Sequence, residues 1–182
     1  SICTRGKRSN IDNPRFCEPC AYGSVQPLDG KDYCTKCGKG KFSKDVGNPV
    51  GCTACETGWY NSETGAIQCK PVPPGYRSDG NLSQIHPCPP GYISEGMTTL
   101  CVPVGPGYFQ PYFNASISIE CPPGSFSADA GSSTCTDCPK GTYIGTTKGK
   151  VCKPSTLGFV TNAERAATGQ IRCDFGTFSD HL

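Results

Sequence analysis

The sequence predicts a small disulfide-rich fold that is mostly β and irregular, with little helix. We expect an elongated, solenoid-like rod of cysteine-rich modules of about 17 residues, each a short β-hairpin. Three observations predict this fold. Of 182 residues, 15 are cysteine. Leu, Ile, Val and Phe make only 30 residues, about 16%, which is too few for one ordinary hydrophobic core. A motif with cysteine at its start recurs every 16 to 18 residues.

Charge and hydropathy exclude several classes of protein. The formal net charge is +2, and charges of both signs are scattered, which argues against nucleic acid or an anionic membrane as the partner. No apolar run approaches the roughly 20 residues that a membrane span needs. The abundance of cysteine predicts a secreted or extracellular-surface protein. Because an initiator Met and a signal peptide are missing, we expect a mature chain or a fragment.

The repeat divides residues 1–182 into what we expect to be a single tandem array. Modules start at residues 3, 20, 37, 55, 72, 88, 104, 121, 138 and 155, and an incomplete one starts at 173. The third residue after every start is glycine, which suits a backbone with positive φ or one that approaches a neighbour closely. These repeat glycines are Gly6, Gly23, Gly40, Gly58, Gly75, Gly91, Gly107, Gly124, Gly141, Gly158 and Gly176.

Each module continues from its repeat glycine into a short strand pattern. Two residues after the glycine stands a bulky apolar side chain, except at Arg8 and Arg77, and the next residue is polar except at Ile144. A bulky residue, a polar residue and then turn residues describe a short strand with one covered face. A second glycine suits the return turn of a hairpin, as at Gly30, Gly47, Gly65 and Gly131. Only the alanine-rich stretch around Arg165 predicts any helix, and at most one turn.

The cysteines that are missing indicate how the others pair. Seven modules carry a cysteine at the start and another 13 to 15 residues later, whereas the modules that start at 72, 104 and 155 lack both. If the two cysteines of a module form a disulfide, they should be lost together, because the loss of one would leave the other unpaired. If each cysteine instead paired with one in the next module, the partner position of Cys55 would be occupied by Ile85, and Cys55 would have no partner. We therefore predict seven disulfides within modules: Cys3–Cys17, Cys20–Cys34, Cys37–Cys52, Cys55–Cys69, Cys88–Cys101, Cys121–Cys135 and Cys138–Cys152.

The remaining cysteine, Cys173, starts a module whose second cysteine would fall beyond Leu182. One interpretation is that the sequence is a piece of a longer array. The other is that a second chain completes the module, through a covalent or interlocked contact. In the modules without a disulfide, we expect apolar pairs such as Val72 and Ile85 to fill the space of the bridge. We also expect these modules to be less tightly held than the disulfide-bonded ones.

Zinc binding is the rival interpretation of the cysteine pattern. The pairs Cys17/Cys20 and Cys34/Cys37 have a spacing that is typical of a zinc ribbon. If four cysteines bound each zinc ion, however, the cysteines should be missing four at a time. Cys69 and Cys152 would also lack a full set of four ligands. Thiol redox catalysis is disfavoured because no βαβ unit is visible. We expect neither a metal nor a cofactor.

The sequence does not indicate an enzyme. His86 and His181 stand in different modules, with no recurrent carboxylate or nucleophile near either, so we predict no catalytic residue. Two sequons predict N-glycosylation at Asn81 and Asn114. The densest aromatic cluster has two possible roles, as local core in place of the absent bridge or as a docking patch; it comprises Tyr108, Phe109, Tyr112 and Phe113.

Residues 121 to 143, Cys-Pro-Pro-Gly-Ser-Phe-Ser…Gly…Cys-Thr-Asp-Cys-Pro-Lys-Gly-Thr-Tyr, resemble the ephrin-receptor-like cysteine-rich repeat. That repeat is akin to tumour-necrosis-factor-receptor and EGF-like modules. The resemblance covers nearly the whole chain, is most specific over 3–69 and 121–152, and is broken in the three modules without cysteine pairs. It implies an elongated extracellular stack without catalytic residues, of the kind found in receptors, adhesive proteins and the surface or filament glycoproteins of protists and algae.

Three functions follow as hypotheses. The first is a secreted, glycosylated structural protein that forms or stiffens an extracellular fibre by head-to-tail stacking, with copies of itself and glycans as partners. The second is a rod-like receptor ectodomain that binds a ligand. The third, more remote, is a zinc-binding interaction module.

Overall fold

The computed structural model describes residues 2–174, and contacts between Cα atoms divide the chain into two compact units. Unit 1 is Ser1–His86 with Gly96–Leu100, and unit 2 is Pro87–Glu95 with Cys101–Leu182. The described residues form strands, turns and bends and contain no helix. They accordingly hold no helix of the length and apolarity that crossing a membrane requires.

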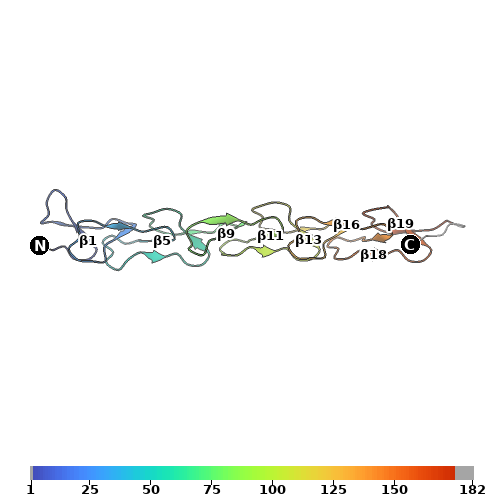
Figure 1. The fold of residues 1–182 in the computed structure, drawn as a ribbon, viewed down its shortest axis with the longest axis horizontal. Helices are drawn as coiled ribbons and strands as arrows, with labels where there is room; N and C mark the ends of the chain where they lie inside the picture. The colour runs from blue at the N-terminus through green and yellow to red at the C-terminus, as the bar shows by residue number, and fades with distance from the viewer. Residues whose placement is uncertain (1, 175–182) are drawn as a thin grey trace. The chain divides into compact units, whose positions relative to one another are not determined.

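Consecutive short strands pair into ten two-stranded sheets, which follow one another in chain order within each unit (Figure 1). The first ten strands are β1 (Lys7–Ser9), β2 (Cys17–Pro19), β3 (Ser24–Val25), β4 (Thr35–Lys36), β5 (Lys41–Phe42), β6 (Thr53–Ala54), β7 (Trp59–Tyr60), β8 (Lys70–Pro71), β9 (Tyr76–Ser78) and β10 (Ile85–Pro87). The others are β11 (Tyr92–Ile93), β12 (Val102–Pro103), β13 (Tyr108–Phe109), β14 (Ile119–Glu120), β15 (Ser125–Phe126), β16 (Thr136–Asp137), β17 (Thr142–Tyr143), β18 (Lys153–Pro154), β19 (Phe159–Thr161) and β20 (Gln170–Arg172).

Among the described residues, one hairpin lies in each of the ten complete modules that the sequence predicts. In the module that starts at Cys20, β3 pairs antiparallel with β4, so that Ser24 lies opposite Lys36 and Val25 opposite Thr35. A two-stranded hairpin is marginally stable at best in water, and strands of two or three residues are shorter than most. The hairpins therefore need the covalent bridges and the neighbouring modules to hold their shape.

Seven disulfides each join the two cysteines of one module, with Cα–Cα distances of 5.5 to 5.8 Å. The pairs are Cys3–Cys17, Cys20–Cys34, Cys37–Cys52, Cys55–Cys69, Cys88–Cys101, Cys121–Cys135 and Cys138–Cys152. Cys173, in the described part of the chain, carries a free and half-buried thiol. The fold is thus a cysteine-rich repeat of short β-hairpins stapled one module at a time.

The modules without a disulfide replace the bridge in two ways. Val72 and Val104 take the buried place of the first cysteine, and each is only 1% exposed. In the module that starts at Ser155, the side-chain oxygen of Gln170 instead accepts a hydrogen bond from the backbone N–H of Thr156 at 2.9 Å. A side-chain hydrogen bond thus links the two ends of that module.

The expected helical turn around Arg165 is wrong. The stretch forms bends, and Ala166 has a left-handed backbone with φ of 50°. This conformation lets the backbone N–H of Ala166 donate to the carbonyl oxygen of Cys138 at 3.1 Å. The stretch is the return turn of its hairpin, and the contact with the preceding module overrides the helix propensity of alanine.

Each unit has its own core, in which cysteines and polar side chains are buried; we call this set of residues the polar column. Cysteine or valine at the module start is buried in every module from Cys3 to Cys138. The polar residue that follows the bulky one is also buried, at Gln26, Ser43, Asn61, Ser78, Ser94, Gln110 and Ser127. The bulky residue itself is half-buried in most modules, as at Phe42 and Phe126. In most modules the polar residue is therefore more deeply buried than the bulky one, although Val25 and Ile144 are buried apolar residues.

Candidate functional site: the contact between successive modules

Successive modules are joined by three backbone hydrogen bonds. Between the second and third modules, the N–H of Gly23 donates to the carbonyl of Ser43 at 2.9 Å. The N–H of Gly47, in the turn of the third module, donates to the carbonyl of Cys20 at 2.8 Å. One step further along, the N–H of Ser43 donates to the carbonyl of Ala66 at 3.0 Å. All six groups belong to the main chain, so no side chain takes part in these bonds.

Bonds of these three kinds recur along both units, although some pairs of modules lack one or two of them: the N–H of Leu82, for example, donates to the carbonyl of Asp79 in its own module. The repeat glycine donates to the next module from Gly6, Gly40, Gly91, Gly107 and Gly124. The residue that follows the bulky one donates to the next turn from Ser9, Gln26, Asn61, Ser78, Ser94, Gln110, Ser127 and Ile144. The turn donates back to a module start from Gly30, Gly65, Met97, Asn114, Gly131, Lys148 and Ala166. The contact between successive modules is therefore of one type, which recurs within each unit.

The repeat glycines also contact the module two steps ahead. Gly6, Gly23, Gly40, Gly58, Gly75, Gly91, Gly107, Gly124, Gly141 and Gly158 all have positive φ, and Gly176 lies outside the described residues. A Cβ added at Gly6 would lie 2.0 Å from the carbonyl oxygen of Gly47. Similar clashes, at 1.9 to 2.5 Å, would arise at Gly23, Gly40, Gly58, Gly91, Gly107 and Gly124. In each of these seven contacts, a return turn thus rests on a glycine two modules earlier.

The return turns hold a second left-handed position, which sequence reasoning found only in part. Glycine occupies it at Gly30, Gly47, Gly65 and Gly131, all with positive φ. In five other modules the corresponding residue is not glycine yet has φ between 50° and 62°; these residues are Leu82, Met97, Asn114, Lys148 and Ala166. The sequence signal for these five is their distance from the module start, nine to eleven residues, and not their chemistry.

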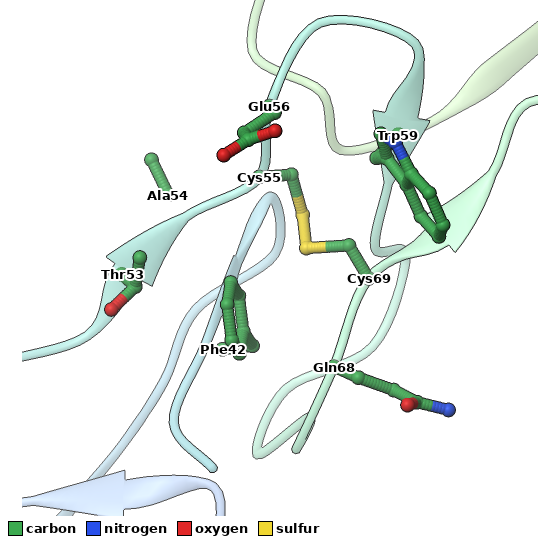
Figure 2. A pocket seen from close by; sticks show the side chains of 8 residues that line it. All are labelled: Phe42, Thr53, Ala54, Cys55, Glu56, Trp59, Gln68 and Cys69. Carbon is green, nitrogen blue, oxygen red and sulfur yellow. A yellow bond between two sulfur atoms is a disulfide. The ribbon is translucent and has the colours of Figure 1, made fainter. Parts of the chain in front are cut away.

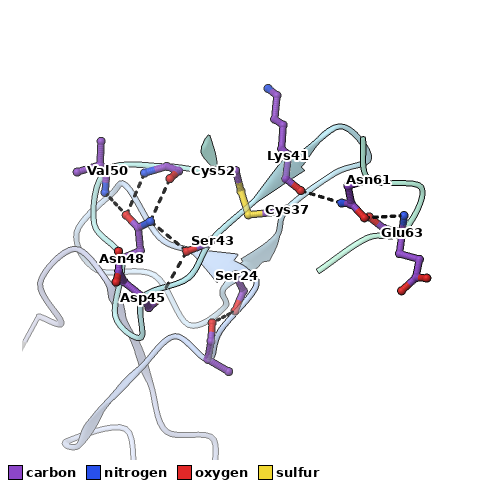
Figure 3. Close-up of a disulfide and its surroundings, with 12 residues drawn as sticks. Ser24, Cys37, Lys41, Ser43, Asp45, Asn48, Val50, Cys52, Asn61 and Glu63 are labelled. Carbon is purple, nitrogen blue, oxygen red and sulfur yellow. Dashed lines mark hydrogen bonds between the residues drawn. A yellow bond between two sulfur atoms is a disulfide. The ribbon is translucent and has the colours of Figure 1, made fainter. Parts of the chain in front are cut away.

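Buried polar side chains tie each turn to its strand (Figure 3). The side-chain amide of Asn48 donates to the hydroxyl of Ser43 at 3.0 Å and to the carbonyl of Gly51 at 3.1 Å. The amide of Asn61 donates to the carbonyl of Lys41, in the preceding module, at 2.8 Å. Because these groups are paired, burying them does not carry the cost of an unsatisfied donor. The polar column thus supports the turn that the next contact uses.

A groove of about 270 Å³ opens beside the disulfide Cys55–Cys69 in unit 1 (Figure 2). Phe42, Trp59 and the two cysteines give it apolar walls, and Thr53, Ala54, Glu56 and Gln68 complete the lining. A corresponding groove in unit 2 is lined by Phe126, Thr136, Asp137, Cys138, Pro139 and Arg165. The repeat therefore places a small amphipathic groove at the same point of two different modules.

The module that starts at Val104 has no disulfide but carries a charged contact on its hairpin. The ammonium of Lys148 lies 3.0 Å from the Glu120 carboxylate and 5.5 Å from the centre of the Tyr108 ring. Hydrogen bonds from Lys148 and then Thr147 lower the pKa of Glu120. The hydrogen bond with Tyr108 and the pairing with Glu120 raise the pKa of Lys148. Lys148, which lies two modules ahead, thus contacts both strands of this hairpin. We call this contact of Lys148 with Glu120 and Tyr108 the clasp.

Both sequon asparagines are exposed, Asn81 and Asn114 alike. The sequon hydroxyl of Ser83 donates to the Asp79 carboxylate at 2.6 Å, and this bond is the main reason why the pKa of Asp79 is lowered. His86 is exposed as well, while His181 lies outside the described residues.

The structure separates the aromatic cluster into two parts. Tyr108 and Phe109 are half-buried in β13 and serve local packing. Tyr112 and Phe113 are 69% and 62% exposed, so the local-core interpretation is wrong for these two residues.

The sulfur atoms of the Cys-x-x-Cys pairs lie in disulfides, and residues 2–174 contain no cluster of three His, Cys, Asp or Glu side chains that could hold a metal ion. Disulfides of this number fit an oxidising, extracellular environment. In the comparisons with known proteins, no protein-family model and no curated protein sequence matches the chain.

Proposed function

We propose that this protein is a secreted, glycosylated structural protein that forms or stiffens an extracellular fibre by head-to-tail stacking. The observation that carries the proposal is that main-chain hydrogen bonds of the same three kinds join modules along both units. A contact of this kind is available to any module that keeps the repeat glycine, including one from a second copy. A head-to-tail contact that does not close into a ring generates a filament.

The source of stability supports the same proposal. Each disulfide closes a loop of 13 to 15 residues and is worth about 3 kcal/mol in the chain-entropy model. The hairpins are therefore held by local covalent bonds and not by one large core, which suits a structural element that functions outside the cell. The exposed Asn81 and Asn114 would carry the glycans. The resemblance to ephrin-receptor-like repeats, which occur in surface and filament glycoproteins, agrees with this role.

Electron microscopy of the native material tests the proposal, and Gly158 offers a sharp variant. Gly158 has the φ of a repeat glycine, yet a Cβ added there would meet no atom within 4 Å. If the turn of another copy rests on Gly158, Gly158→Ala abolishes regular filaments and leaves the individual chain folded. Gly38→Ala is the matched control, because Gly38 also has open space around it but is not a repeat glycine. Filaments unaffected by Gly158→Ala, or no filaments from the unmodified protein, would contradict the proposal.

The second candidate function is a ligand-binding receptor ectodomain, and the groove beside Trp59 favours it. Ligand sites combine apolar walls with a few placed polar groups, as Phe42, Trp59, Glu56 and Gln68 do here. This function predicts that the native protein is dispersed and monomeric, and that Trp59→Ala removes ligand binding without unfolding the chain. Regular filaments of the native material would favour the first function over this one.

A further inference from the structure

A second kind of groove lies in the module that starts at Cys138, in unit 2, and it is basic. It has a volume of about 270 Å³ and is lined by the segment from Tyr143 to Val151, apart from Thr147, and by Lys153. Three of its lining residues are lysines, Lys148, Lys150 and Lys153, and none is acidic. The grooves beside Trp59 and Phe126 differ in this respect, since each includes a carboxylate.

The charge of this groove is not required by the fold. In the preceding module, the residues that correspond to Lys148, Lys150 and Lys153 are Gly131, Ser133 and Thr136. Residues 138–154 contain four lysines and no Asp or Glu. A module that folds equally well with neutral residues at these positions has lysines there for another reason, and attraction of an anion is the simplest one.

Two of the three lysines are available to a ligand. Lys148 is paired with Glu120, which holds its ammonium at one end of the groove. Lys150 and Lys153 are exposed, and neither belongs to an ion pair among the described residues. An anion in the groove would therefore meet two uncompensated positive charges and a third that is already held in position.

The uncharged part of the lining suits a sugar ring better than a bare ion. The Tyr143 ring and Val151, which is 71% exposed, offer apolar surface for C–H groups. The hydroxyls of Tyr143 and Thr146 can exchange hydrogen bonds with sugar hydroxyls. The volume lies just below the range of about 300–1,000 Å³ that is typical of drug-sized ligands, as expected for one sugar unit of a longer chain.

We propose that this groove binds a sulfated sugar unit of an acidic polysaccharide. Lys150 and Lys153 contact the sulfate groups, and Tyr143 with Val151 covers a face of the ring. The interaction goes beyond the proposed structural role and would attach the protein to an acidic extracellular matrix. Because charged contacts on a surface are screened by salt, the affinity falls as ionic strength rises above about 0.1 M.

Isothermal titration calorimetry with a heparin hexasaccharide tests the proposal, using the full chain with its disulfides intact. We expect the variant Lys150→Gln/Lys153→Gln to bind about tenfold more weakly or worse, since hydrogen bonds to charged groups are the strong ones. The variant Lys39→Gln/Lys44→Gln removes the same charge from two exposed lysines of unit 1 and keeps the affinity of the unmodified protein. Circular dichroism verifies that both variants are folded.

Three further ligands identify what the groove recognises. The desulfated, N-acetylated hexasaccharide and inorganic sulfate should each bind much more weakly than the sulfated hexasaccharide. A DNA duplex of similar charge should depend little on Lys150 and Lys153. Equal binding by the double variant, by the desulfated sugar or by inorganic sulfate would overturn the proposal, as would a DNA duplex that binds the same lysines as tightly. Filament formation is a separate readout, so failure here leaves the proposed structural function standing.

Discussion

The Cβ that alanine would add at Gly23 points at the carbonyl oxygen of Gly65, only 1.9 Å away, although Gly65 belongs to the turn two modules later. Gly23 is also buried and has φ of 74°. Two requirements therefore coincide at this residue, a left-handed backbone and a close approach of another main chain. Both are met by glycine alone, which explains why the repeat tolerates valine in place of cysteine but keeps its glycine.

Alanine substitutions at three glycines should separate these two requirements. Gly23→Ala should destabilise the fold by about 2–5 kcal/mol, from a left-handed backbone cost of about 1–2 and a packing cost of about 1–3 kcal/mol. Gly158→Ala should cost only the backbone part, about 1–2 kcal/mol, because its space is open. Gly38→Ala, with neither requirement, should change stability by less than about 0.5 kcal/mol.

Denaturant unfolding of the oxidised protein measures this series. An equal cost for Gly23→Ala and Gly158→Ala would show that the turn does not rest on Gly23, and the contact between alternate modules would have to be abandoned.

Much of the fold could be predicted from the sequence because the repeat is carried by glycine and cysteine. The repeat glycine has few substitutes because it has positive φ, and it recurs in every module, while the cysteines recur in bonded pairs in seven of them. Short hairpins and little helix follow from the same spacing. The expected turn of helix around Arg165 is wrong because Ala166 must place its N–H against Cys138, a requirement that no local pattern contains.

The left-handed turn residues predict a gain of stability on mutation. Leu82 has φ of 57°, a conformation that costs a residue with a Cβ about 1–2 kcal/mol and costs glycine little. Leu82→Gly should therefore stabilise the protein by up to about 1 kcal/mol, after the loss of its half-buried side chain is deducted. Ala66→Gly is the control. Ala66 follows a turn glycine but its backbone is not left-handed, so this substitution should destabilise the protein by about 0.5–1 kcal/mol. Thermal unfolding that ranks the two variants in the opposite order would disprove the strain.

A buried hydroxyl predicts a second stabilising change. Ser78 is 1% exposed, and its Oγ is the one buried side-chain polar atom of the described residues that has no hydrogen-bond partner. An unsatisfied buried group costs about 1–3 kcal/mol, so Ser78→Ala should raise stability by about 1 kcal/mol. Ser127 occupies the same place in another module, but its hydroxyl bonds to Ser132 and to the carbonyl of Asp129.

Ser127→Ala should consequently lower stability by about 1 kcal/mol, the opposite sign for the same substitution. Chemical denaturation of both variants decides the matter, and a loss of stability in Ser78→Ala would mean that its hydroxyl does have a partner in solution.

The candidate site was harder to predict than the fold, and the polar column shows why. A Ser, Asn or Gln beside a bulky apolar residue has the pattern of a solvent-exposed position, yet Gln26 and Asn61 are buried. Main-chain carbonyls accept from their side-chain amides: that of Tyr33, in the same module, for Gln26, and that of Lys41, in the preceding module, for Asn61. The basic groove could not be predicted from the net charge of +2 either, because that sum combines its lysines with acidic residues in other modules.

The module that starts at Val104 should accept the disulfide that it lacks. Its hairpin pairs Phe109 with Ile119, as the disulfide-bonded module at Cys121 pairs Phe126 with Thr136. Val104→Cys/Ser118→Cys therefore places two thiols where Cys121 and Cys135 lie in that module. The oxidised variant should gain about 3 kcal/mol, and the same protein after selective reduction provides the control. Free thiols in the purified variant, or no gain on oxidation, would argue against equivalent modules.

The clasp between Lys148 and Glu120 predicts how this hairpin responds to pH. The pKa of Glu120 is lowered, so the contribution of its carboxylate to stability is present above the pKa of the unfolded chain and is lost as pH falls through the folded value. The pKa of Lys148 is raised, so its contribution is present below its unfolded pKa and is lost as pH rises through the folded one. The clasp is complete only between these two limits.

An NMR titration of the Glu120 carboxyl carbon measures the acid limit directly. Because Lys148 is the main cause of the shift, Lys148→Gln should raise the pKa of Glu120, and only the smaller effect of the Thr147 hydrogen bond should remain. Lys150→Gln removes an equal charge two residues away, outside the clasp, so it should leave the Glu120 pKa nearly unchanged. If both substitutions shifted that pKa equally, the general charge of the module and not a specific contact would set it, and Lys148 would then be as free as Lys150 to bind an anion.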